Sequence, residues 1–147
     1  MTREDWMARA LELAREAGAE GEVPVGCVIV WDGQIIGEGR NRRETANTAL
    51  GHAEIEAIAM ACRSMKGWRL HRAELYVTLE PCPMCAGAII NARIPTIYYG
   101  AKDDKAGCCG SVLNLFEERF NHHPRIYGGI LEEECAGLLQ EFFQALR

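Results

Sequence analysis

The first third of the chain combines one helical pattern of apolar residues with two short β-branched runs. Apolar side chains recur at helical spacing through residues 6–17, and Gly18 follows, which predicts an amphipathic helix of about four turns. Short apolar runs then occupy residues 25–31 and 34–37. Because Asp-Gly at 32–33 separates these runs and is a strong hairpin signal, we expect them to pair as antiparallel strands.

Helices and strands alternate in the next part of the chain. The polar segment 41–51 is expected to be a loop, and helical spacing resumes at His52 and continues to Gly67. One face of this helix is shared by Ile55, Ile58, Ala59, Cys62 and Met65. Strands are predicted at residues 75–79 and 96–99. The short helix between them carries the apolar residues Ala86, Ala88, Ile89 and Ile90.

The remaining elements complete a predicted mixed sheet. Residues 101–111 are expected to form a glycine-containing loop. A closing amphipathic helix is indicated by Cys135, Leu138, Leu139, Phe142, Phe143 and Leu146. Because the strands 75–79 and 96–99 are joined through a helix, they should be parallel. The order of elements therefore predicts an α/β fold with helices on both faces of a mixed sheet.

Length and composition narrow the class of protein. At 147 residues the chain fits one domain, residues 1–147, with room for a proper core. It has no run of about 18 apolar residues that could span a membrane, and residues 1–5 lack the start of a secretory signal, so we expect a cytoplasmic protein. In that reducing compartment the seven cysteines are not expected to form a disulfide framework. The net charge of −5 argues weakly against a general nucleic-acid coat.

Two short motifs carry the residue types of a metal site. Residues 52–54 (His-Ala-Glu) begin one predicted helix, and residues 81–85 (Pro-Cys-Pro-Met-Cys) begin another. One imidazole and two thiolates are ligands that zinc prefers, and a site with three protein ligands leaves a fourth position open for water. Cys82 and Cys85 are three residues apart, so they share one face of a first helical turn. We therefore predict one catalytic zinc ion per chain, held by His52, Cys82 and Cys85.

Glu54 is the candidate proton carrier of this site. In a regular helix its side chain would diverge from that of His52 by about 200°. If the helix end points at the metal, His52 binds the ion while Glu54 accepts a proton from the reacting water and passes it to the substrate. A structural zinc site or a redox pair are the alternative interpretations of the two cysteines. A structural site would need a fourth protein ligand, and the spare candidates lie in another segment: Cys108, Cys109, His122 and His123.

The two motifs follow the zinc-deaminase pattern of His-x-Glu and Pro-Cys-x-x-Cys. The sequence resembles the bacterial tRNA adenosine deaminases, within the cytidine deaminase-like superfamily. The resemblance extends over nearly the whole chain and is carried by residues 22–26, 37–42, 52–54, 76–82, 84–88, 99–101, 129–131 and 134–136. It implies a three-layer α/β/α sandwich with a five-stranded mixed sheet, usually as a homodimer. It also implies conversion of the wobble adenosine of a tRNA anticodon loop to inosine.

The resemblance also implies roles for individual residues. The zinc ligands would be His52, Cys82 and Cys85. Glu54 would move the protons while an activated water attacks C6 of the flipped base and ammonia leaves. The residues that would contact the base or its neighbouring nucleotide are Asn41, the backbone N–H of Ala53, Val25 and Asp103.

Several departures from the family pattern keep a second substrate class open. Residues 47–51 (Asn-Thr-Ala-Leu-Gly) replace the Asp-Pro-Thr-Ala that usually precedes the His-x-Glu motif, and residues 108–109 are both Cys where small residues are usual. The chain ends at Arg147 without the more basic tail of many members. Together with the net acidity, the altered loop and the short tail favour a deaminase of a free nucleobase or nucleoside, such as guanine or cytosine, as the alternative. A non-enzymatic binding module is disfavoured because it would not need Glu54.

For the basic residues and the remaining cysteines, the sequence predicts ordinary surface and core positions. We expect the basic residues around Asn41 to lie on the solvated surface, although they could also contact phosphates of a folded-back anticodon stem-loop. They are Arg40, Arg42 and Arg43. Cys27, Cys62 and Cys135 fall on apolar faces, where free cysteine behaves as a small hydrophobic residue, so we expect all three in the core.

Overall fold

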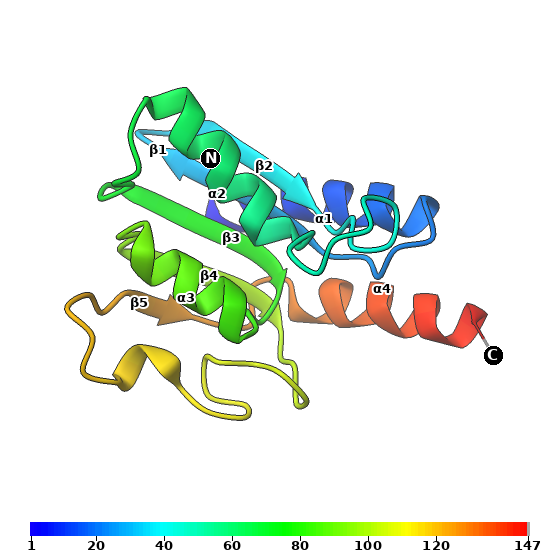
Figure 1. Ribbon diagram of the computed structural model, residues 1–147. Helices are drawn as coiled ribbons and strands as arrows, with labels where there is room; N and C mark the ends of the chain where they lie inside the picture. The colour runs from blue at the N-terminus through cyan, green and yellow to red at the C-terminus, as the bar shows by residue number, and fades with distance from the viewer. Residues whose placement is uncertain (147) are drawn as a thin grey trace.

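The computed structural model describes residues 1–146 and contains one five-stranded sheet in the order β2-β1-β3-β4-β5 (Figure 1). The strands are β1 (Gly26–Trp31), β2 (Gln34–Arg40), β3 (Ala73–Leu79), β4 (Thr96–Ala101) and β5 (Arg125–Tyr127). β1 pairs antiparallel with both β2 and β3, whereas β3, β4 and β5 are parallel. The mixed sheet, the hairpin between β1 and β2 and the parallel pairing of β3 with β4 are therefore confirmed.

Helices cover both faces of the sheet. They are α1 (Arg3–Ala19), α2 (Ala53–Met65), α3 (Pro83–Asn91) and α4 (Glu132–Ala145), with a short 3-10 helix, η1 (Leu115–Glu117), before β5. Figure 1 shows α2 and α3 together on one face of the sheet, and α1 and α4 on the other. This is the three-layer α/β/α sandwich that the resemblance implies. Among the described residues, no helix is both long and apolar enough to cross a membrane.

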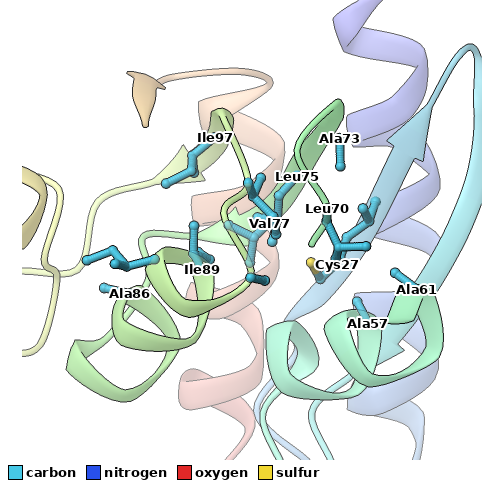
Figure 2. Close-up of a cluster of buried hydrophobic side chains, with 14 of the residues drawn as sticks. Cys27, Ala57, Ala61, Leu70, Ala73, Leu75, Val77, Ala86, Ile89 and Ile97 are labelled. Carbon is cyan, nitrogen blue, oxygen red and sulfur yellow. The ribbon is translucent and has the colours of Figure 1, made fainter. Parts of the chain in front are cut away.

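Alternation along the central strands divides the core into two clusters, because successive strand side chains point to opposite faces of a sheet. The cluster beneath α2 and α3, shown in Figure 2, receives Cys27, Ile29, Leu75 and Val77 from β1 and β3. The cluster beneath α1 and α4 receives Val28, Val30 and Tyr76 from the same two strands. Both central strands are therefore buried on both faces, as their nearly continuous apolar runs indicate.

Helix α2 packs on β2 through small residues. Its fully buried apolar side chains are Ala53, Ala57 and Ala61, which are spaced four residues apart. They lie against Gly37 and Gly39, where an added Cβ would collide with the backbone oxygens of Ala57 and Ala53. The residues predicted to share an apolar face are exposed or only partly buried, although two of them, Ile58 and Cys62, pack against the core: Ile55, Ile58, Ala59, Cys62 and Met65. Close backbone contact between helix and strand leaves room only for alanine and glycine, so the small residues take the buried positions.

Other elements differ from the prediction in extent. β2 continues through Arg40 rather than ending at residue 37, and the three-residue edge strand β5 is too short to be predicted from the pattern. Helix α4 begins at Glu132, and its last turns are less buried than expected, with Phe143 46% exposed. Cys27 and Cys135 are core residues as predicted, whereas Cys62 is only partly buried. The apolar residues of α3 pack mainly on the core of this chain: Ala86, Ile89 and Ile90 are buried there.

Candidate metal centre and active site

The N-termini of α2 and α3 meet at the end of strand β3. His52 is the N-cap residue of α2 and Cys82 is the N-cap residue of α3, and neither side chain makes a capping hydrogen bond. Nδ1 of His52 lies 3.6 Å from Sγ of Cys82 and 3.5 Å from Sγ of Cys85. All three ligand atoms lie within 4.8 Å of one another, and no other such cluster occurs in residues 1–146. The structure therefore brings together the three predicted metal ligands.

The geometry and chemistry of this donor set fit zinc. In a tetrahedral site with a Zn–N bond of about 2.0 Å and a Zn–S bond of about 2.3 Å, the nitrogen and sulfur ligands are about 3.5 Å apart. Both N···S separations in the structure, 3.6 Å and 3.5 Å, agree with this value. One nitrogen and two sulfur donors also leave one of four tetrahedral positions for a further ligand.

Hydrogen bonds among the three side chains shift the pKa of each of them. The hydrogen bond with Cys85 lowers the pKa of the Cys82 thiol to about 4, and the contact with His52 acts in the same direction. The neighbouring Cys82 thiolate and burial both raise the pKa of Cys85, and the hydrogen bond with Cys82 raises the pKa of His52. Because metal ligands bind as thiolate and neutral imidazole, metal binding at this cluster is coupled to the protonation of its ligands.

Glu54 lies in the first turn of α2 and is not part of the metal-ligand cluster. Its side chain is buried, with 4% exposed, and it lines the pocket above that cluster. Burial raises the pKa of Glu54 to about 7, since desolvation disfavours the carboxylate, and the charge of Cys82 acts in the same direction. A carboxyl group with a pKa near neutrality can both accept and return a proton.

A cavity of about 210 Å³ opens onto the metal-ligand cluster and Glu54. This volume lies below the range of about 300–1,000 Å³ that is typical of sites for drug-sized ligands, so it suits a single heterocyclic base. The predicted substrate contacts all lie in its lining: Val25, Asn41, Ala53 and Asp103. The N–H of Ala53 is the first of α2, where backbone donors have no intrahelical partner.

Asn41 is held in place by its own amide group. Its Nδ2 donates to the carbonyl oxygen of Val23 at 3.1 Å, and its Oδ1 accepts from the backbone N–H of Arg43 at 3.1 Å. A side-chain amide has two N–H donors and two acceptor lone pairs. One donor and one acceptor therefore remain to bind a ligand in the cavity.

Two buried carboxylates tie down the loops that border the cavity, and the sequence reasoning missed both. Glu22 accepts hydrogen bonds from the backbone N–H groups of Glu44 (3.1 Å) and Thr45 (2.6 Å). Glu80 accepts several from the loop that contains Asp103. Burial raises the pKa of each carboxyl, but these hydrogen bonds outweigh it, and both pKa values lie below the usual one. An acidic residue directly beside an apolar run was the only available signal in each case.

The lining also contains further residues that the sequence reasoning did not assign to the pocket. They are Val23, Arg43, Leu79, Glu80 and Ala106. Arg43 belongs to the basic group beside Asn41, but its two neighbours are paired with carboxylates. Arg40 lies 2.7 Å from Glu20, and Arg42 lies 3.3 Å from Glu56. Within residues 1–146 no such ion pair includes Arg43, so its charge is available at the pocket.

The spare metal-ligand candidates lie outside the cluster. His122 contacts the carbonyl oxygen of Ile94 at 2.7 Å, and His123 contacts that of Phe116 at 2.9 Å. Cys108 is buried, with its Sγ 3.6 Å from the carbonyl oxygen of Ala106. Burial raises the pKa of the Cys108 thiol, which disfavours the thiolate form. The described residues thus offer no fourth protein ligand, which argues against a purely structural metal site.

An α/β/α sandwich with one histidine, two cysteines and a non-ligand glutamate at two helix N-termini is the arrangement of the nucleobase deaminases. A profile of the MafB19-like deaminase family matches residues 1–147, and the chain belongs to this family.

Relatives and solved structures agree with this assignment. The chain is 48% identical to the tRNA-specific adenosine deaminase of Bacillus subtilis, over 100% of this chain and 92% of that protein. Among solved structures, a protein from work on A-to-I editing by tRNA:A34 deaminases shares 47% identity and a TM-score of 0.89, over 92% of this chain and 99% of the other. The guanine deaminase of Bacillus subtilis shares 35% identity and a TM-score of 0.68, over 100% and 94% of the two chains.

Proposed function

We propose that this protein converts adenosine to inosine at the wobble position of a tRNA anticodon loop, using one zinc ion held by His52, Cys82 and Cys85. The observation that carries the proposal is the meeting of these three ligand atoms with buried Glu54 beneath a cavity of about 210 Å³. The choice of substrate rests on the higher identity to the tRNA-specific adenosine deaminase, 48%, than to the guanine deaminase, 35%.

The metal would supply one part of the chemistry. When bound by one imidazole and two thiolates, zinc lowers the pKa of a coordinated water towards neutrality. The protein positions this group through the N-cap residues His52 and Cys82, whose helices are fixed on the sheet by the core beneath α2 and α3. The partial positive charges of both helix N-termini favour the thiolate ligands.

Glu54 moves the protons of the reaction. Its carboxylate accepts a proton from the attacking water and delivers it to N1 of the adenine ring. The second water proton reaches the departing amino group, so that adenosine and water yield inosine and ammonia. A pKa of about 7 allows Glu54 to act as base and then as acid at the same pH.

The remaining pocket residues select and orient the base. The free donor and acceptor of Asn41 and the first N–H of α2, from Ala53, can hydrogen-bond the base edge. Val25 contributes an apolar wall, and Asp103 brings a further loop to the cavity. A cavity of this size admits a base only after it leaves its stack, which is least costly in a single-stranded loop.

A substrate panel tests this proposal. The protein is incubated with an anticodon stem-loop that carries adenosine at the wobble position, with the same stem-loop carrying guanosine there, and with free guanine, cytosine, adenosine and cytidine. Inosine in the adenosine stem-loop, measured by nucleoside mass spectrometry, is the expected result. Ammonia released only from a free base or nucleoside would contradict the proposal and favour a small-molecule deaminase.

Three coarser expectations accompany this function. We propose that the active species is a cytoplasmic homodimer built from one deaminase domain, residues 1–147, per chain. Light scattering coupled to size exclusion gives the mass of the assembly, and a mass equal to the 16.3 kDa chain at micromolar concentration would contradict the dimer. The buried residues of α3 pack on their own core and so do not themselves argue for association.

A further inference from the structure

Glu80 is a buried acidic residue to which the proposed mechanism gives no task. It follows β3 directly and precedes Pro81 and the metal-ligand candidate Cys82. Only 2% of its surface is exposed, yet it does not belong to the metal-ligand cluster. A buried carboxylate without hydrogen-bond partners would strongly destabilise a fold, so its partners indicate what it does.

All side-chain partners of Glu80 belong to one loop, residues 103–111. Its Oε1 accepts from the backbone N–H of Asp103 at 3.0 Å and from the hydroxyl of Ser111 at 2.5 Å. Its Oε2 accepts from the backbone N–H groups of Cys109 at 2.8 Å and Ser111 at 3.2 Å. One carboxylate therefore holds both ends of the loop. Between these ends, Gly107 passes so close that an added Cβ would overlap the carboxylate.

The loop that Glu80 holds forms one side of the cavity. Asp103 and Ala106 both line the cavity, and Oδ1 of Asp103 accepts from the N–H groups of Lys105 (3.0 Å) and Ala106 (3.2 Å). This turn fixes the two lining residues relative to each other. The N–H of Cys108 donates to the carbonyl oxygen of Pro81 at 2.8 Å, next to Cys82. The four bonds to Glu80 and this backbone bond therefore hold the turn over the cavity.

We propose that Glu80 is a positioning residue for the deamination reaction, because its carboxylate holds the loop 103–111 so that Asp103 and Ala106 shape the substrate side of the cavity. The proposal rests on the proposed function for its kinetic effects. Glu80 also borders the cavity, but all of its side-chain hydrogen bonds go to the loop, so it acts through the loop. Loss of the carboxylate should loosen the loop and weaken substrate binding while the metal-ligand cluster stays intact.

The variant Glu80→Gln tests this inference with little change in volume. Glutamine keeps one acceptor oxygen but turns an NH₂ group towards backbone donors, so about half of the hydrogen bonds are lost. We expect KM for the adenosine stem-loop to rise about tenfold, the lower end of the effect of losing one hydrogen bond to a charged group. The turnover number kcat should stay within about twofold, and zinc should stay at one per chain. Ser111→Ala, which removes one of the four bonds, should give a smaller rise in KM.

A double-mutant cycle separates positioning from general structural support. If Glu80 acts through the loop, Glu80→Gln should raise KM by less than about twofold in an Asp103→Ala background, because contacting or coupled residues are non-additive. Retention of the full tenfold effect in that background would overturn the proposal. So would loss of zinc from Glu80→Gln.

Amide hydrogen exchange tests the same inference without a substrate. In Glu80→Gln the N–H groups of Asp103, Cys109 and Ser111 should lose protection, while those of β3 and β4 keep it. Equal loss of protection in both strands would overturn the positioning role. Should Glu80→Gln not fold, Gly107→Ala displaces the loop with the carboxylate retained and should give the same KM and exchange pattern; wild-type values would overturn the proposal. If the wild-type protein forms no inosine in the adenosine stem-loop, the proposed function is wrong. The hydrogen-exchange result still decides whether Glu80 positions the loop.

Discussion

Replacing Gly39 by alanine should separate helix α2 from strand β2 and displace the catalytic helix end. The added Cβ would overlap the carbonyl oxygen of Ala53 and would lie 2.8 Å from the backbone nitrogen of Ala57. Non-bonded heavy atoms reach their optimum at about 3.5–4.0 Å, so this end of α2 must move by about 1 Å. Ala53 stands between His52 and Glu54, and both functional side chains move with it. A misplacement of about 1 Å can lower the rate of an enzyme about 100-fold.

The same variant should lose stability to a smaller degree. Overpacking a close contact costs about 1–3 kcal/mol in the free energy of unfolding. For a chain of about 150 residues this corresponds to a melting temperature lower by about 2–12 °C. The protein should therefore remain folded at 25 °C while kcat on the adenosine stem-loop falls sharply.

A matched substitution provides the control for Gly39→Ala. Gly137 lies within helix α4, and no atom lies within 4 Å of an added Cβ at this position. Alanine there should leave kcat unchanged and stabilise the protein by about 0.5–1 kcal/mol, since glycine is unfavourable in a helix interior. The assays are kcat on the stem-loop, thermal unfolding and zinc content for both variants. A wild-type kcat in Gly39→Ala, or the same loss in Gly137→Ala, would refute the argument from close packing.

Two further predictions concern charged groups at the loops. The pKa of Glu22 is lower folded than unfolded, so its stabilising effect is present above the unfolded value of about 4.3 and is lost as pH falls through the folded pKa. Urea unfolding should therefore show Glu22→Gln about 1–3 kcal/mol less stable than wild type at pH 7, with the difference shrinking below about pH 4; a constant difference would contradict this. Stem-loop affinity measured by fluorescence anisotropy should weaken as the salt concentration rises. Arg43→Ala should reduce the slope of the logarithm of the binding constant against the logarithm of the salt concentration by about 0.7, the value for one phosphate contact to a single strand. The paired Arg40→Ala should leave the slope unchanged, and equal slopes in all three proteins would argue against phosphate contact by Arg43.

The sequence patterns predict most of the fold because both central strands are long, apolar and bounded by clear turns. Helix α2 shows where pattern alone fails. Its isoleucine and methionine residues suggest a buried face, but the actual contact is made by Ala53, Ala57 and Ala61 against glycines of β2. Apolar character is a poor guide where backbones approach closely, since side-chain size then decides which residues are buried. Strand β5 is not predicted for another reason, because three residues at a sheet edge are too few to show a periodic pattern.

The chemical centre is predicted more completely than its surroundings. His52, Cys82 and Cys85 follow from ligand chemistry and spacing, and the structure brings them within metal-binding distance. The loop anchors Glu22 and Glu80 could not be predicted in the same way. Their partners are backbone N–H groups contributed by distant segments, and a backbone donor has no sequence signature. Such residues become recognisable only when the chain is folded.

The most direct test of the account measures zinc and inosine in the same preparations of wild type, Glu54→Gln and Cys82→Ser. Glu54→Gln should keep about one zinc per chain and lose about 10²–10⁴-fold in the rate of inosine formation at the wobble position, the usual contribution of a proton carrier. Cys82→Ser should lose both the metal and the activity. Near-wild-type turnover by Glu54→Gln, or full activity of Cys82→Ser without bound zinc, would contradict the central claim that a zinc ion and Glu54 together deaminate the base.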